Sequence, residues 1–266
     1  MNEMKAASSV LQKMHVLYDN GVPGVVPGIV PYNVMLTGWA GLATFVIDDL
    51  PLSKSSPITT ESTRKEPSST PISVGWYCND APFKAEEILR TMISHSDEKY
   101  WKSVGSRHHR CLEASPNRIS YEKVMLAWSN SRFPNSGKRT LWWLAQLWAE
   151  NETREVLAST GTSQQADDEA SDSLRPTVAT YNIAMKASVV SEDATAAEKL
   201  LLELGDKYRT SGRMALRPNS ESFAIIIRAW LASACESSGV DNRMTSLQRA
   251  AQWLSSFEEV ARENDL

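Results

Sequence analysis

The 266-residue sequence has little cysteine, no long hydrophobic run and no excess of positive charge. Cys78, Cys111 and Cys235 are odd in number and widely spaced, so a disulfide framework is not expected and a reducing compartment is the default. No apolar run approaches the roughly 18–20 residues of a membrane span, so we expect no membrane partner. The formal net charge of −4 argues against a protein that coats nucleic acid through bulk electrostatics.

The first residues, MNEMKAASSVLQKM, contain no apolar core of the kind that secretory signals carry. Glu3 and Asp19 also make the start unlike an organellar transit peptide, which is poor in acidic residues. No targeting peptide is therefore visible in this chain.

The sequence contains one short motif in four copies, which we call the repeated phrase. Its copies are each preceded by a proline, namely Pro27, Pro116, Pro176 and Pro218. Five residues after each proline stands an aromatic residue, namely Tyr32, Tyr121, Tyr181 and Phe223. Six residues further on stands a small one, namely Gly38, Ala127, Ala187 and Ala229. A pattern repeated at fixed offsets indicates one structural unit used several times.

A second pattern follows each copy, occurs once more before the first proline, and indicates an amphipathic helix. Apolar or small residues recur at i, i+3, i+4 and i+7, the spacing of one helical face. Its instances begin at Ala7, Ala85, Thr140, Ala197 and Ala250. The hydroxyl residues directly before the aromatics, which we predict to be N-caps, are Ser120, Thr180 and Ser222. Gly21 and Gly212 suit the turn that leaves the second helix. The unit is therefore a helix–turn–helix hairpin.

These units predict an all-α fold, an α-solenoid of stacked antiparallel helix-turn-helix repeats with disordered loops between helices. Residues 1–28 are the second helix of a truncated first repeat, which suggests a segment of a longer array. Four repeats follow at 29–117, 118–177, 178–219 and 220–266. A Ser/Thr/Pro-rich insertion at about 48–80 and an acidic loop at about 150–174 are expected to be disordered. Residues 93–115 form a locally basic connector.

The phrase VATYNI at residues 178–183, with Pro176 before it and A-x-x-L-L-x-x-L from Ala197 after it, resembles a pentatricopeptide repeat. The resemblance covers almost the whole chain apart from the insertions. The rival tetratricopeptide pattern needs a Trp-Leu-Gly…Tyr first helix, which is missing here. The resemblance implies an adaptor that binds single-stranded RNA, one base per repeat, rather than DNA. It also implies an organelle, mitochondrion or plastid, and a role in RNA processing, stability or translation.

The resemblance further implies which residues read bases. These are the residue after the aromatic and the residue after the closing proline of the same unit. The pairs are Asn33 with Asn117, Glu122 with Thr177, and Asn182 with Asn219. The residues expected to pack on a base face, two before each aromatic, are Val30, Ile119 and Ala179. The two Asn–Asn pairs are similar to the family's pyrimidine-preferring combination.

Several residues depart from that pattern. Glu122 replaces the usual Asn, Thr or Ser, Ala224 of the last unit cannot read a base edge, and Glu221 is a carboxylate where the family has an apolar residue. Lys186 and Arg228 occupy matched positions and are either phosphate contacts or solvated surface. The departures, with the acidic loop, favour a second hypothesis: a protein-interaction scaffold on the same helical repeats. A degenerate fragment without independent function is a third.

No group in the sequence points to catalysis. His108, His109 and Cys111 invite a zinc site, but no second ligand pair has metal-ligand spacing, so we expect neither a metal nor a cofactor. Glu86–Glu87 and Glu258–Glu259 are interpreted as solvated helix faces rather than acid/base pairs. We expect the protein not to be an enzyme.

Overall fold

A computed structural model describes residues 2–44 except 21, 23, 24 and 26, residues 80–96, residues 114–159 except 132, and residues 174–263 except 192 and 238. The helices in these ranges are α1 (Asn2–Asp19), α2 (Ile29–Thr44), α3 (Ala81–Ser96), α5 (Arg118–Asn130), α6 (Ser136–Ser159), α8 (Val178–Val190), α9 (Ala194–Ser211), α10 (Ser220–Glu236) and α11 (Val240–Glu263). A short 3-10 helix, η3 (Met214–Leu216), precedes α10. The described residues include no strand, which confirms the all-α prediction. No helix among them is long and apolar enough to cross a membrane.

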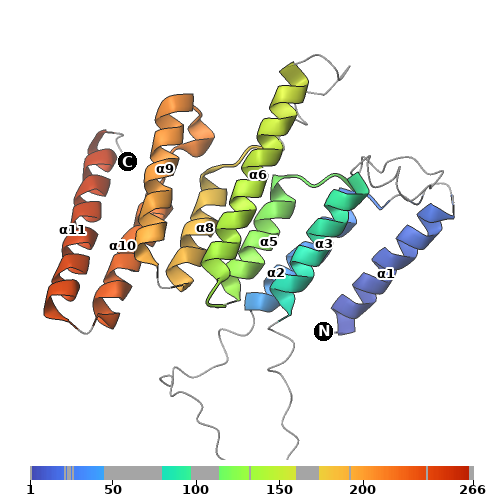
Figure 1. The fold of residues 1–266 in the computed structure, drawn as a ribbon, viewed down its shortest axis with the longest axis horizontal. Coiled ribbons are helices and arrows are strands. Elements are labelled where there is room, and N and C mark those ends of the chain that lie inside the picture. Colours follow the sequence, from blue (N-terminus) through green and yellow to red (C-terminus); the bar gives the residue numbers. More distant parts are fainter. Residues whose placement is uncertain are drawn as a thin grey trace, which may run out of the picture.

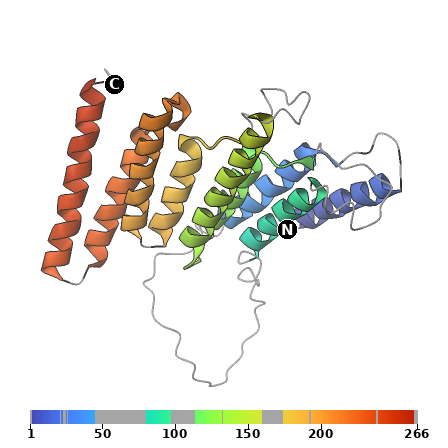
Figure 2. The same cartoon turned by 45° about the horizontal axis from the view of Figure 1, so that its top comes forward.

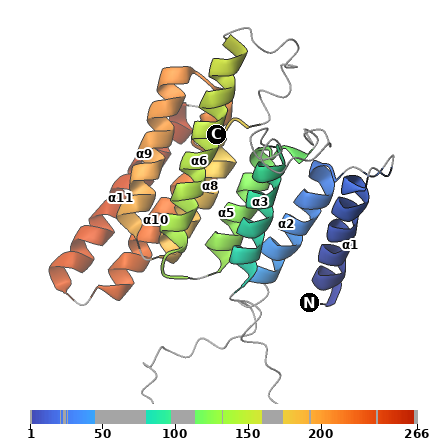
Figure 3. The same cartoon turned by 45° about the vertical axis from the view of Figure 1, so that its right-hand side comes forward.

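The helices form a row of hairpins in two layers (Figure 1). Each hairpin pairs neighbours in the chain: α2 with α3, α5 with α6, α8 with α9, and α10 with α11. One layer holds α2, α5, α8 and α10, which pack side by side in that order, and we call it the first layer. The second layer holds α3, α6, α9 and α11 (Figure 2). Helix α1 packs on α2 at one edge of the row, and α10 and α11 lie at the other (Figure 3).

The core lies between the two layers and is made of the repeated positions. The four aromatics of the repeated phrase are buried, as are the small residues Ala127, Ala187 and Ala229. On the second layer, the i, i+3, i+4, i+7 stripe supplies buried side chains in three consecutive helices. Those of its last two positions are Leu89 and Met92, Leu144 and Leu147, and Leu201 and Leu204. One recurring pattern thus builds one continuous apolar seam.

Two glycines have defined roles in the row, one at a close contact between helices and one at a helix end. The backbone N–H of Gly137, in the first turn of α6, donates to Ser191 Oγ at 2.9 Å. A Cβ added at Gly137 would lie 3.2 Å from Ser188 Cα and 3.3 Å from the Ala187 carbonyl oxygen of α8, so only glycine fits without a shift. Gly212 ends α9 in the left-handed conformation at φ 65°, as expected for a helix C-cap. Gly21 lies outside the described residues.

The structure corrects two boundaries. Helix α6 continues through Ser159, so the first ten residues of the predicted acidic loop are helical. The extension is supported by an Arg154–Glu150 ion pair at 3.2 Å and by Asn151 Nδ2 donating to Glu155 Oε1 at 3.2 Å, both one turn apart. Helix α3 continues to Ser96, four residues into the predicted connector. Most of the 48–80 insertion and the rest of the acidic loop lie outside the described residues.

Candidate nucleic-acid interface

Three first-layer helices begin in the same way, two residues after a proline, so that the residue directly after the proline is the N-cap. Their N-caps, all in extended backbone conformation, are Asn117, Thr177 and Asn219. The hydroxyl residue before the aromatic is therefore the third helical residue and not the N-cap, which corrects the prediction for Ser120, Thr180 and Ser222. Each of these hydroxyls accepts the backbone N–H of its N-cap, at 3.3, 3.1 and 3.3 Å. The arrangement is a capping box in which the third position is a hydroxyl residue.

The same hydroxyl also reaches the preceding hairpin. Ser120 Oγ donates to Asn33 Oδ1 at 2.8 Å, Thr180 Oγ1 to Glu122 Oε1 at 2.5 Å, and Ser222 Oγ to Asn182 Oδ1 at 2.8 Å. We call each set of three residues a joint. The first joint is Asn33, Ser120 and Asn117, the second is Glu122, Thr180 and Thr177, and the third is Asn182, Ser222 and Asn219. Each joint brings together one residue pair that the sequence singled out.

In the first joint both amide oxygens turn toward one hydroxyl. Ser120 Oγ lies 2.8 Å from Asn33 Oδ1 and 3.1 Å from Asn117 Oδ1, and the Ser120 backbone N–H donates to Asn117 Oδ1 at 3.1 Å. Neither Asn33 Nδ2 nor Asn117 Nδ2 makes a hydrogen bond within the described ranges, and both residues are half-buried. The joint therefore presents two N–H₂ groups as donors.

The second joint has a different chemistry, because Glu122 can only accept when it is ionised. Glu122 Oε1 accepts a hydrogen bond from the Thr180 hydroxyl and lies 3.5 Å from Arg118 Nε. Thr177 Oγ1 lies 3.4 Å from Thr180 Oγ1. The half-buried carboxylate thus offers an acceptor beside a hydroxyl that can donate or accept.

In the third joint the Asn182 amide is covered. Asn182 is only 2% exposed, and its Nδ2 donates to Asn219 Oδ1 at 3.3 Å and to Glu221 Oε2 at 3.0 Å. The other oxygen of Glu221 accepts from Lys186 Nζ at 2.6 Å. The Lys186 hydrogen bond, helped by that of Asn182, holds the pKa of Glu221 below its ordinary value. In the third joint the ionised carboxylate of Glu221 therefore occupies the Asn182 amide. The matching amide N–H₂ of Asn33 in the first joint has no such partner among the described residues.

Beside the joints, the second residue of each first-layer helix points to solvent. Val30 is 68% exposed, and Ile119 and Ala179 are exposed as well. Glu221 holds this position on α10, and Ala224 stands where the other units have the first residue of a joint. Exposed aliphatic side chains at a repeated position beside polar groups are suited to covering the flat face of a base.

Known proteins give no match. No family model fits the sequence, and searches of curated proteins and of solved structures return nothing similar. Function is therefore inferred from the residues and their contacts.

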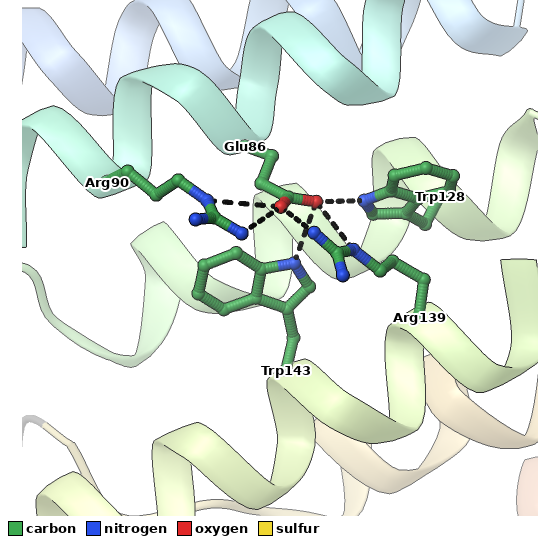
Figure 4. A network of polar contacts seen from close by, with 5 residues as sticks. All are labelled: Glu86, Arg90, Trp128, Arg139 and Trp143. Atoms are coloured by element: carbon green, nitrogen blue, oxygen red, sulfur yellow. Dashed lines mark hydrogen bonds and ion pairs between the residues drawn. The ribbon is translucent and has the colours of Figure 1, made fainter.

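The structure also contains a polar network that the sequence interpretation missed. Glu86, expected on a solvated face, is 5% exposed and lies between hairpins (Figure 4). Its carboxylate accepts from Trp128 Nε1 at 3.2 Å, from Trp143 Nε1 at 3.4 Å, and from the guanidinium groups of Arg90 and Arg139. Burial acts to raise the pKa of Glu86, but the bonds from Arg139 and Arg90 outweigh it, so the pKa lies below its ordinary value.

The same contact recurs at the other edge of the row. Glu198 of α9 accepts from Trp230 Nε1 at 2.8 Å and lies 3.5 Å from Arg249 Nη1 of α11. Glu198 and Glu86 occupy matched positions, each directly after the alanine that opens a stripe. The signal for this contact in the sequence is a glutamate directly after that alanine, combined with a tryptophan directly after the small residue of the next copy. Both contacts join neighbouring hairpins of the row.

Metal ligands do not gather in the described part of the chain, where no group of three His, Cys, Asp or Glu side chains is placed to hold an ion. His108, His109 and Cys111 lie outside it.

Proposed function

We propose that this chain is an α-solenoid of the pentatricopeptide-repeat type and a single-stranded RNA-binding adaptor in organellar RNA processing, stability or translation. The observation that carries the proposal is the row of three joints. Each places two polar side chains, one from each of two neighbouring hairpins, next to an exposed aliphatic or small residue at the start of a helix. Single-stranded RNA is read by such combinations of a stacking surface and a few edge contacts.

The first joint has the groups best suited to hydrogen-bond the edge of a base. The two N–H₂ groups of Asn33 and Asn117 are donors, and a pyrimidine presents carbonyl oxygens on its edge. Val30 lies beside them as the stacking surface. The second joint, with the Glu122 carboxylate, suits a base edge that carries an exocyclic amine. The third joint binds a base only after Glu221 moves away from Asn182.

Phosphate attraction is weak in this proposal. The chain has a net charge of −4, and Lys186, one of two matched cations on the first layer, is paired with Glu221. The other, Arg228, donates from Nε to the Ala224 carbonyl oxygen at 3.2 Å and keeps its guanidinium end exposed. With one or two bases held at about 1–3 kcal/mol each, this segment binds RNA in the micromolar range or more weakly.

The test is fluorescence anisotropy of the purified chain with short poly-pyrimidine and poly-purine RNAs at two salt concentrations. We expect saturable binding that favours pyrimidine and weakens as salt rises. The double variant Asn33→Ala/Asn117→Ala should weaken pyrimidine binding about tenfold or more, since two edge contacts are lost. Gln146→Ala, an exposed amide on α6 of the second layer, is the matched control and should bind as the parent does.

A second candidate function is a protein-interaction scaffold. It is favoured by the burial of Asn182 in the third joint and by an aromatic groove of about 570 Å³ between α3 and the α5–α6 hairpin, whose lining includes Phe83, Trp128, Phe133 and Trp142. Lys138 and Arg139 border that groove, which would suit a peptide with acidic and apolar residues. RNA binding that is absent, or unchanged in Asn33→Ala/Asn117→Ala, would move the assignment to this scaffold.

A further inference from the structure

Helix α11, at one edge of the row, leaves an apolar face without a neighbour among the described helices (Figure 1). Leu254 is 47% exposed, whereas the residues at its matched positions, Leu89, Leu144 and Leu201, are 0%, 4% and 3% exposed. In those three helices the next hairpin of the row covers the position. On α11 the same surface is open.

The open surface follows one straight line along the helix. Its residues alternate in spacing by four and three, and we call them the α11 seam: Val240, Met244, Leu247, Ala251, Leu254, Glu258 and Ala261. All but the half-buried Ala261 are exposed. Alternate spacing by four and three is the pattern by which one helix packs along another in a coiled coil. The occupant of the seam is therefore expected to be a helix.

That helix is unlike the hairpins already in the row, because α10 and α11 lack contacts that join the other hairpins. Ala224 has no acceptor for an incoming hydroxyl, so the joint that links the other neighbouring first-layer helices cannot form there. Ala251 stands at the position of Glu86 and Glu198, each of which accepts from a tryptophan indole of the next hairpin. Leu247 is larger than its counterparts in α3, α6 and α9, which are Pro82, Gly137 and Ala194.

The charges beside the seam identify a partner. Asp241 and Arg243 lie at the N-terminal end of α11, Glu258 and Arg262 lie near its C-terminal end, and all four are exposed. Ala251 lies midway between the two groups. When a second α11 runs antiparallel across Ala251, Arg243 of each copy meets Glu258 of the other, and Asp241 meets Arg262. A parallel arrangement brings like charges together instead.

We propose that the α11 seam is a self-association surface, through which two copies of the chain form a symmetric antiparallel dimer. The apolar residues between 244 and 254 form the centre of the contact, and the charged groups at both ends fix its direction and register. The joints of the first layer take no part in it, so this dimer does not depend on RNA binding.

The experiment measures the mass of the full chain by light scattering and by sedimentation, from about 1 to 100 μM. We expect a concentration-dependent dimer. Leu247→Glu/Leu254→Glu should raise the dissociation constant more than about tenfold while the circular dichroism spectrum is unchanged. Leu202→Glu, an exposed leucine of α9 outside the seam, is the control and should leave the dimer intact.

A charge exchange tests the direction of packing. Arg243→Glu alone should weaken the dimer, because two carboxylates then face each other, and Arg243→Glu/Glu258→Arg should restore it. A chain that stays monomeric at every concentration, or a dimer that survives Leu247→Glu/Leu254→Glu, would overturn the proposal. Failure of the double exchange to restore association would overturn the antiparallel arrangement.

Discussion

The Glu86 network offers the sharpest test of how the row is held together. In Glu86→Ala the indole N–H groups of Trp128 and Trp143 lose their acceptor. Leaving a buried donor without a partner costs about 1–3 kcal/mol, and the 3.4 Å bond to Trp143 belongs at the low end of that range. Arg90 is more than half exposed and Arg139 about a third, so both can turn to water and add little.

The expected loss of folding free energy for Glu86→Ala is therefore about 3 kcal/mol. For a chain of this size that corresponds to a fall in Tm of roughly 6–12 °C. Differential scanning calorimetry and urea unfolding give the two quantities independently. Glu86→Gln, which keeps one acceptor oxygen but loses the charge, should fall between the parent and the alanine variant.

Glu87→Ala is the matched control, since Glu87 is the exposed neighbour and pairs only with Lys84 on the surface, at 2.7 Å. An exposed pair of this kind contributes less than about 1 kcal/mol. If Glu86→Ala and Glu87→Ala lower Tm by the same amount, the buried carboxylate does not hold the hairpins together and the reasoning fails.

Three further predictions follow from the packing. Because the pKa of Glu86 lies below its ordinary value, its stabilising effect is present above about pH 4.3 and is lost as the pH falls through the lower folded-state pKa. The Tm difference between the parent and Glu86→Gln should therefore shrink in titrations below about pH 4. Gly137→Ala should destabilise the fold by about 1–3 kcal/mol in urea, whereas Gly41→Ala, with nothing within 4 Å, should be neutral or stabilising. Ser222→Ala removes a hydroxyl shared by two helices and should lower the stability by about 1 kcal/mol; an unchanged urea midpoint would contradict that role.

The sequence predicted the helices well because its information was periodic. The prolines, aromatics and stripes recur at fixed offsets, and the structure has helices at each of them. The predicted capping hydroxyls lie three residues after the true N-caps, because Asn117 and Asn219 are as well suited to an N-cap as serine is. Only three-dimensional packing separates the two assignments.

The Glu86 network was not predictable in the same way. Its partners Trp128, Arg139 and Trp143 lie 42 to 57 residues away in the sequence and belong to another hairpin. A glutamate in a helix is usually solvated, and the sign of its burial lay in the match between Glu86 and Glu198, each with a tryptophan in the next copy of the motif. The covering of Asn182 by Glu221 was hidden for the same reason, although both residues had been singled out separately.

The joints have a consequence for how such a protein can be cut and rejoined. Each joint takes one side chain from one hairpin and two from the next, so a hairpin is not a self-contained module. Duplicating or exchanging a whole hairpin between its natural boundaries would split two joints and create two new pairings at once. A recombination that preserves each joint must instead place its crossover within the first turns of a first-layer helix, after the hydroxyl residue and before the residue that follows the aromatic. The exchangeable unit would then run from the residue after one aromatic, such as Asn33, to the aromatic of the next first-layer helix, such as Tyr121.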